Sequence, residues 1–329
     1  MNLYEQQRAN RRRTWLIMIA FVGFLLVLGL GFDTFYLGTA NGFVPIGTIA
    51  SLGVGSVSAL ASYFAGDRAV LLSTSATPLE EVVAGAADAD KLKLRQLDNI
   101  VEEMSIASGL PKPRVYVVPD PDPNAFATGR NPEHASIAVT RGLLDALSRE
   151  ELQGVVAHEL SHVRNFDIRV MTMVAALVGA VALLADWARR GMMWGGGRRR
   201  GGDRGKGGIG GILFFAIWIV ALVLAPLVAQ LLAMMVSRSR EYLADASGAE
   251  LTRNPLGLAH ALEKIESAGA PTKAIKQGSA HLCIADPLGR RMNIKEGFWS
   301  DLFASHPPMA ARIAALQEMA FQRSGARGV

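Results

Sequence analysis

Cysteine and charge are both scarce in this sequence. Cys283 is the single cysteine among 329 residues, so the fold cannot depend on an internal disulfide and needs no oxidising compartment. Charged residues make up 19% of the chain, below the ~25% usual in soluble domains, whereas 50% of the residues are hydrophobic. This much apolar surface excludes a chain that is disordered throughout and indicates membrane-spanning segments.

The net charge of +5 comes from 34 Lys and Arg against 29 Asp and Glu. A basic chain can bind nucleic acid, but here much of the excess lies beside hydrophobic stretches. We therefore interpret these basic residues as charges that flank membrane segments, and we expect no nucleic-acid partner.

Four apolar stretches are candidate membrane spans, at residues 14–32, 43–65, 170–185 and 212–236. All but the third are clearly long enough to cross a hydrocarbon core of about 30 Å, and the third is marginal. Basic residues precede the first stretch, and the loop at 33–42 contains no Lys or Arg. The positive-inside rule therefore places the N-terminus and residues 66–168 in the cytoplasm.

These spans divide the chain into four parts. Residues 1–65 form an N-terminal anchor, 66–168 a first polar part, 169–236 a second pair of helices, and 237–329 a second polar part. The loop at 191–211 in the second pair is rich in Gly and Arg, and the positive-inside rule disfavours its translocation. The second pair therefore either crosses the membrane or forms a re-entrant hairpin.

The polar parts alternate between helix and strand patterns. Helical spacing of apolar residues predicts a helix over 91–110, and runs at 114–118 and 135–140 predict strands on either side of an extended stretch at 124–129. Ser148 and Glu151 form a capping box at the start of a further helix. The predicted fold class is α+β: a mostly helical domain with a small sheet, plus about four transmembrane helices.

The helix that follows the capping box contains His158-Glu-Leu-Ser-His162. Residues four apart share one face of a helix, so both imidazoles can bind one ion, and Zn²⁺ suits neutral imidazole nitrogen. Glu159 stands beside the first ligand, where it can deprotonate a metal-bound water. The apolar neighbours of these residues indicate a buried helix. We therefore predict the zinc arrangement of a metalloprotease.

A catalytic zinc site needs a third protein ligand and an open position. The spacing favours Glu241, which lies four residues before Asp245 on a predicted helix. One of these carboxylates can bind zinc while the other orients a ligand histidine through its ring N–H. Spacing alone leaves open a solvent-exposed helix face that carries Arg, Glu and Asp.

Four motifs, in this order, resemble the HtpX-type membrane metalloproteases, which are related to the CAAX prenyl proteases. The motifs are NAFATG at 124–129, AHELSH at 157–162, SRSREYLADASGA at 237–249 and SHPPMAARI at 305–313. The resemblance implies a gluzincin-like fold with one Zn²⁺ per chain. It also implies Glu241 as the third ligand, with Asp245 as the carboxylate that supports the site from behind.

The resemblance assigns roles to two further motifs. It implies an edge strand that pairs with an extended peptide substrate, with the Asn124 side chain holding a substrate carbonyl. The residues of this strand are Asn124, Ala125, Phe126 and Ala127. It also implies that His306 and Arg312 line the cleft and face the developing oxyanion. The alternatives are an ordinary loop turn for the first motif, and a proline-containing loop with a surface arginine for the second.

The chain departs from the family pattern at Phe166, where relatives often have glycine, and this change affects the end of the HELSH helix rather than the ligands. We expect a structural role for Asp167 and a buried, unreactive position for Cys283. Three histidines belong to no motif and are predicted not to bind metal: His134, His260 and His281.

We interpret the chain as a multi-pass zinc endopeptidase of the plasma (inner) membrane, with its active site facing the cytoplasm. His158, His162 and Glu241 hold the zinc, and Glu159 is the general base. By resemblance, the substrates are damaged or misassembled membrane proteins in stress-linked quality control. The alternatives are a CAAX-type prenyl protease and a non-catalytic, zinc-stabilised membrane scaffold, which would not need Glu159.

Overall fold

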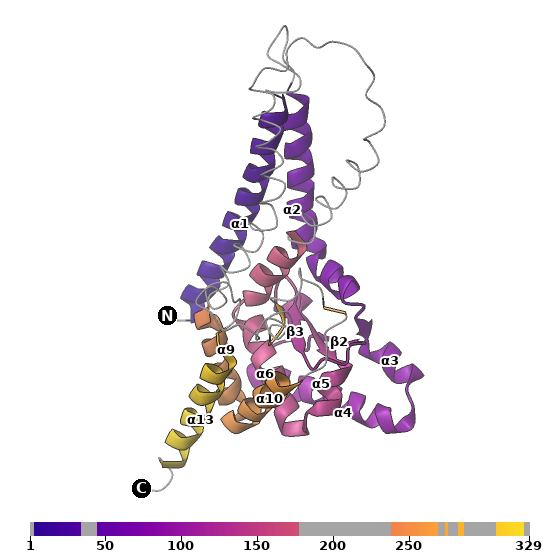
Figure 1. The fold of residues 1–329 in the computed structure, drawn as a ribbon, viewed down its shortest axis with the longest axis vertical. Helices are drawn as coiled ribbons and strands as arrows, with labels where there is room; N and C mark the ends of the chain where they lie inside the picture. Colours follow the sequence, from indigo (N-terminus) through magenta and orange to yellow (C-terminus); the bar gives the residue numbers. More distant parts are fainter. Residues whose placement is uncertain are drawn as a thin grey trace.

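The computed structural model describes residues 3–33, 45–177, 238–268, 274–275, 282–285 and 307–325. Two long helices, α1 (Leu3–Phe32) and α2 (Ile46–Ser73), lie side by side and extend away from the other labelled elements (Figure 1). Those elements gather at the end of the hairpin where α1 begins and α2 ends. The described chain is therefore a helical hairpin with a mixed domain at its base.

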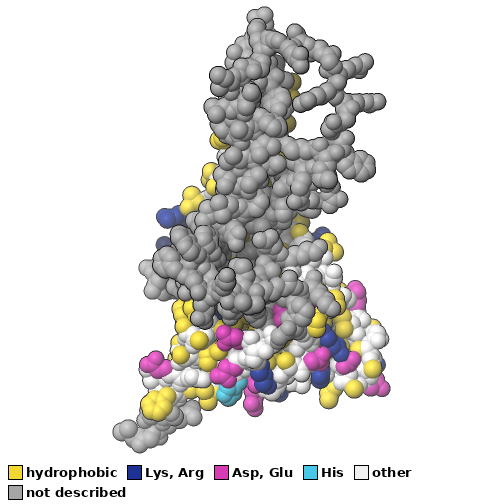
Figure 2. All heavy atoms as spheres, viewed as in Figure 1, with side chains coloured by type: hydrophobic (Ala, Val, Ile, Leu, Met, Phe, Trp, Pro, Cys, Tyr) yellow, Lys and Arg dark blue, Asp and Glu magenta, His cyan; other side chains and the backbone are white. Residues whose placement is uncertain are grey.

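The hairpin carries large apolar side chains that the domain does not cover. Val57 and Phe64 of α2 are 67% and 59% exposed, and Trp15 of α1 is 64% exposed. Among the described residues, one helical stretch, Thr48–Ser73, is long and apolar enough to cross a membrane. By contrast, on the face of the domain seen in Figure 2, acidic and basic side chains are interspersed.

Four transmembrane helices are therefore not confirmed. The first predicted span lies within α1. Residues 46–65 of the second lie in α2, which continues past the predicted end at residue 65 through Asp67 and Arg68 to Ser73. Of the third, residues 170–177 are described and are helical. The fourth span, at 212–236, and the Gly/Arg-rich loop at 191–211 lie outside the described residues.

The domain contains a small mixed sheet with the strand order β1-β2-β4-β3. The inner strands β2 (Arg114–Val118) and β4 (Ser136–Thr140) are parallel. The outer strands β1 (Thr77–Pro78) and β3 (Ala125–Thr128) pair antiparallel with β2 and β4. β3 lies within the extended stretch predicted at 124–129 and ends just before Gly129, whose φ of 142° other residues rarely adopt.

Helices pack around one central helix, α6 (Arg149–Arg164), which contacts β3 and three helices. These are α4 (Asp88–Ser108), α9 (Arg238–Thr252) and α10 (Pro255–Ser267). The remaining elements are α3 (Leu79–Gly85), η2 (Pro132–His134), α5 (Arg141–Ala146) and α13 (Met309–Gly325). The main hydrophobic core joins α4, α6 and α10 to the sheet. The predicted mostly helical domain with a small sheet is confirmed.

Candidate metal centre

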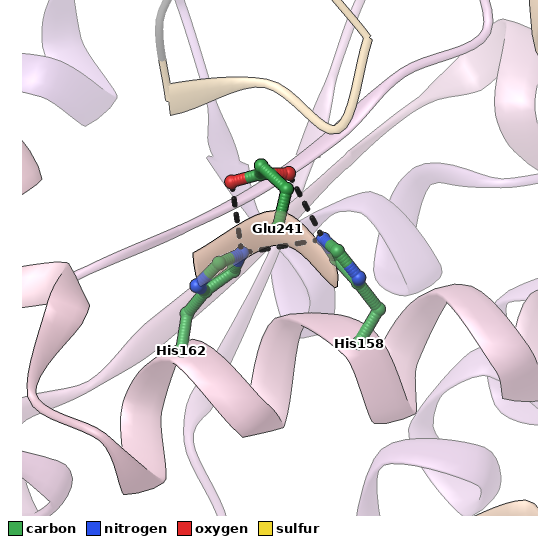
Figure 3. Close-up of side chains that lie close together, drawn as sticks. All are labelled: His158, His162 and Glu241. Carbon is green, nitrogen blue, oxygen red and sulfur yellow. Dashed lines mark hydrogen bonds and ion pairs between the residues drawn. The ribbon is translucent and has the colours of Figure 1, made fainter. Parts of the chain in front are cut away.

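The candidate metal centre is built on α6, whose first turn is fixed by the predicted capping box. The Ser148 side chain accepts a hydrogen bond from the Glu151 backbone, and the Glu151 carboxylate accepts one from Ser148 N at 2.7 Å. Further along, Val155 is fully buried in the main core. This packing sets the rotation of the helix and presents His158 and His162 on one face (Figure 3).

A close contact between α6 and α9 brings the third side chain to this face. A Cβ atom at Gly248 would lie 3.0 Å from the backbone nitrogen of His158, so glycine permits the two helices to approach closely. Glu241, about two turns earlier on α9, points at the two histidines (Figure 3). The motif that supplies the predicted third ligand therefore also contains the residue that makes this contact sterically possible.

The three side chains form a buried triangle of donor atoms. The Nε2 atoms of His158 and His162 are 3.2 Å apart, and the Glu241 oxygens lie 3.7 Å and 3.6 Å from them (Figure 3). The exposed fractions of the residues are 0%, 4% and 1%. Two ligands of a tetrahedral zinc ion, each about 2.05 Å from it, lie about 3.3 Å apart. The donor types and spacings therefore fit a zinc ion.

A carboxylate contacts His158 at the ring nitrogen that does not face Glu241. His158 Nδ1 lies 2.9 Å from Asp245 Oδ1. Arg312 of α13 donates two hydrogen bonds to the same carboxylate, from Nε at 2.8 Å and from Nη2 at 2.7 Å. Burial would raise the pKa of Asp245, but Arg312 and His158 lower it to about 2. Asp245 is therefore charged at neutral pH and holds His158 with Nε2 toward Glu241.

A second carboxylate supports His162 in the same way. Asp167 Oδ2 lies 3.2 Å from His162 Nδ1. Its Oδ1 accepts hydrogen bonds from Asn10 Nδ2 at 2.7 Å and from Arg240 Nη1 at 3.2 Å. Burial opposes protonation of His162, but Asp167 and Glu241 outweigh it and raise the pKa of the metal-free histidine to about 9. The structural role expected for Asp167 is therefore a specific one, a contact with a ligand side chain.

Phe166 has a backbone conformation that favours glycine. Its φ of 59° lies in the left-handed region, where a side chain is strained. This conformation separates α6 from the helix at 167–177 and directs Asp167 back toward His162. Two guanidinium groups lie over the Phe166 ring, that of Arg11 at 5.3 Å and that of Arg169 at 5.1 Å from its centre. These cation–π contacts offset part of the strain.

Glu159 follows the first histidine of the triangle on α6. It is 1% exposed, and burial raises its pKa to about 7, with His162 and the backbone of Ala127 opposing the rise. Within the described part of the chain, its Oε1 has no hydrogen-bond partner. A buried carboxylate with a pKa near neutrality can both take and return a proton.

The predicted substrate strand is β3, and part of its outer edge is already paired. Ile284 N donates to the carbonyl of Ala125 at 2.9 Å, so residues 282–285 lie along this edge. Asn124 is fully buried, and its Nδ2 donates to the carbonyl of Ala285 at 2.9 Å. The Asn124 amide thus has an internal partner in this structure, and its role in holding a substrate carbonyl stays a prediction.

Arg312 also contacts this segment. Its Nη1 donates to the carbonyl of Ile284 at 2.8 Å, and the residue is fully buried. The residue before Ile284 is Cys283, which pairs with Phe126 in an antiparallel bridge. Cys283 is 1% exposed, so it is buried as expected. Nη1 of Arg312 also lies 3.6 Å from Glu241 Oε2, so this arginine contacts both Asp245 and the donor triangle. Its predicted role at the oxyanion stays a prediction.

The remaining histidines divide into two groups. His306 and His281 lie outside the described residues. His134 and His260 are exposed and take no part in the donor triangle. Within the described ranges, His158, His162 and Glu241 form the one cluster with metal-binding spacing.

Sequence analysis missed Asn10 and Arg240. Arg240 directly precedes Glu241, and its partner Asp167 follows His162 by five residues. Closeness in the sequence to the candidate ligands could therefore have pointed to Arg240. Asn10 and Asp167 are 157 residues apart. No periodic pattern or motif in the N-terminal stretch points from one to the other.

The site and the comparisons agree on the class of protein. A glutamate that follows the first of two histidine ligands on a helix is the general base of metalloproteases, so the centre places this chain among the metal-dependent peptidases. Residues 91–320 match the model of peptidase family M48, and the chain belongs to this family. It is therefore a metalloprotease, an enzyme that hydrolyses peptide bonds.

Curated relatives match the chain along nearly its whole length. A "Protease HtpX homolog" of Ligilactobacillus salivarius is 41% identical over 317 residues, which cover 96% of this chain and 100% of the relative. One from Tropheryma whipplei is 41% identical over 328 residues, covering 97% and 99%. The crystal structure of S. mikatae Ste24p matches with a TM-score of 0.46 and 19% identity, covering 95% of this chain and 67% of that one. The resemblance to HtpX proteases predicted from the four motifs is confirmed.

Proposed function

We propose that this chain is a zinc-dependent endopeptidase of the plasma (inner) membrane. In this proposal it cleaves damaged or misassembled membrane proteins at the cytoplasmic face, as part of stress-linked quality control. The observation that supports zinc is the buried triangle of two imidazole nitrogens and a carboxylate oxygen. Nitrogen and oxygen donors at this spacing suit a tetrahedral zinc ion that keeps one open position.

The residues of the centre divide the catalytic work between them. A bound zinc ion supplies Lewis-acid chemistry, which polarises the scissile carbonyl and acidifies a water molecule. His158, His162 and Glu241 would hold the ion. Glu159 accepts the proton of the attacking water and then passes it to the leaving amine, the two transfers expected of a general base at this position.

The outer edge of β3 is the proposed site of substrate pairing, over residues Asn124 to Ala127. Main-chain hydrogen bonds to a strand edge accept many sequences, which suits a protease with varied substrates. A peptide that pairs at Ala125 must displace Ile284 from that carbonyl. His306 and Arg312 remain the proposed contacts of the developing oxyanion, and Arg312 in addition binds Asp245 at two points.

The proposed membrane location is supported by the helical hairpin. One stretch of α2 has the length and apolarity of a membrane span, and large apolar side chains of α1 and α2 are exposed. Lipid would cover this surface, whereas water would leave it unfavourably hydrated. Four basic residues precede the apolar part of α1, which favours a cytoplasmic N-terminus: Arg8, Arg11, Arg12 and Arg13.

The test is a pair of glutamate-to-glutamine variants on the same helix. The full chain is purified in detergent without chelator, and its metal content and its cleavage of casein are measured. Glu159→Gln should keep zinc and lose activity by roughly 10²–10⁴-fold, the usual contribution of a general base. Glu150→Gln, on the exposed first turn of α6, should retain both properties.

Casein cleavage that survives Glu159→Gln would refute the proposed mechanism. Full zinc content with no cleavage of any substrate by the wild type would instead favour a zinc-stabilised scaffold. A prenylated peptide tested beside an unmodified membrane protein separates the CAAX-type alternative, which requires preference for the prenylated peptide.

A further inference from the structure

Asn10 of α1 lies just before the apolar part of its helix, yet it is only 1% exposed. Its Nδ2 donates to Asp167 Oδ1 at 2.7 Å and to the backbone carbonyl of Asn165 at 2.9 Å. Asn165 is the C-cap residue that follows the last residue of α6. One amide from the hairpin therefore binds both the end of the ligand helix and the carboxylate that follows it.

Asp167 connects this amide to the metal centre. Because Nε2 of His162 faces His158 and Glu241, Nδ1 is the nitrogen that donates its proton to Asp167. The Oδ2 atom of Asp167 faces His162, while Oδ1 is held by Asn10 and by Arg240. The two donors fix the rotation of the carboxylate, and the carboxylate fixes the plane of the imidazole.

We propose that Asn10 is a positioning residue for the metal ligand His162 and that it acts through Asp167. The inference rests on the proposed zinc site. A hydrogen bond to an ionised carboxylate is stronger than one between neutral groups, and here both partners are buried, so water does not compete for it. Seating of α1 against the end of α6 thus completes the ligand geometry.

Other contacts hold α1 in this place independently of Asn10. The guanidinium of Arg11 lies 5.3 Å from the centre of the Phe166 ring. α1 also packs along the length of α2. Removal of one amide therefore leaves α1 docked, and the positioning role can be tested separately from the attachment of the helix.

The test compares two substitutions one helical turn apart in α1. Asn10→Leu keeps a similar volume but removes the amide. Thr14→Val is the matched control: Thr14 is 2% exposed and donates to the backbone carbonyl of Asn10, with no contact to Asp167 among the described interactions. Zinc affinity of the full chain in detergent is measured by competition with a chromogenic chelator, and thermal stability is recorded in parallel.

Asn10→Leu should weaken zinc binding by roughly 10-fold, the lower end of the effect seen for groups that orient ligands. Thr14→Val should leave zinc affinity unchanged. In an Asp167→Asn background, Asn10→Leu should change zinc affinity by less than about 2-fold, because the route to His162 is already broken. This loss of effect distinguishes action through Asp167 from a general loss of stability.

Two outcomes would overturn the proposal. One is a lower melting temperature with unchanged zinc affinity in Asn10→Leu, which would make Asn10 a helix anchor only. The other is an equal loss of affinity in both backgrounds. If Asn10→Leu does not fold, Asn10→Ser, which keeps one donor, should show an intermediate affinity, and wild-type affinity in it would also refute the proposal. Failure of the zinc site itself would be visible separately, as a wild type that binds no zinc.

Discussion

Replacement of Asp245 by asparagine tests how far the site depends on its supporting carboxylates. Asp245 accepts from both sides: its Oδ1 faces His158 Nδ1 at 2.9 Å, and its two oxygens bind Arg312 at 2.7 Å and 2.8 Å. An asparagine of the same size turns one of these oxygens into an NH₂ group. In the Oδ1 position that group faces two N–H donors, His158 Nδ1 and Arg312 Nη2, and in the Oδ2 position it faces one, Arg312 Nε. At least one buried contact therefore becomes a repulsion between donors.

The expected magnitude follows from this count. If the His158 contact is lost, the metal site loses one hydrogen bond to a charged group, worth about 1.5–3 kcal/mol. At about 1.4 kcal/mol per factor of ten, that corresponds to a zinc affinity about 10- to 100-fold weaker. Proteolysis at saturating zinc should recover in part, because Glu159 and the three ligands are still present.

The assay is chelator competition followed by casein cleavage across a range of free zinc concentrations. Asp145→Asn is the matched control, since this carboxylate is exposed and belongs to a surface ion pair with Lys93. Zinc affinity within about 3-fold of wild type in Asp245→Asn, against the ~10–100-fold loss expected for such groups, would show that His158 needs no support from behind and would refute the reasoning.

Three further results are expected. Glu241→Ala should lose bound zinc, whereas His260→Ala, at an exposed position outside the donor triangle, should keep it; equal zinc content in metal analysis would move the third ligand elsewhere. Alanine variants are usually more stable than glycine variants, but Phe166→Gly should be more stable to denaturant than Phe166→Ala by about 1 kcal/mol, because the φ of residue 166 is 59°. Greater stability of the alanine variant would show that the backbone is unstrained there. In a Cys283→Ser background, a cysteine at Gly38 should react with an impermeant reagent on intact cells and one at Glu133 should not; labelling at Glu133 would place the domain outside the cytoplasm.

The local elements of the domain could be predicted because their signals are short-range. β2 follows the predicted strand at 114–118, and α6 begins with the predicted Ser148–Glu151 capping box. The three side chains of the candidate metal centre could be predicted equally well, since two of them are four residues apart and the third stands in a motif. Helical periodicity, caps and motif spacing each depend on a few neighbouring residues, which a single sequence displays directly.

The residues that contact the three side chains of the candidate metal centre could be predicted only in part. Spacing on one helix linked Glu241 to Asp245, but the partner of Asp245 is Arg312 on α13, and the amide that holds Asp167 comes from α1. Such pairs are set by how helices pack, and one sequence carries no record of them. The expectation that Arg312 faces the developing oxyanion came from resemblance and stays a prediction. Its two hydrogen bonds to Asp245 could not be predicted from the sequence.

The segment that lies along β3 acts as a tethered competitor for anything that binds there. Ile284 occupies the carbonyl of Ala125, and Arg312 and Asn124 bind the same segment through the carbonyls of Ile284 and Ala285. An incoming peptide gains only the difference between its own pairing and that of the resident chain, and its apparent affinity falls with the fraction of molecules in which the edge is open. A dilute peptide therefore displaces the resident segment from few molecules. A chain confined beside the enzyme has a high effective concentration and can displace it from many. The same segment also shields the edge of β3 from pairing with exposed strands of other molecules. It therefore lowers the apparent affinity for peptides and also reduces the risk of aggregation.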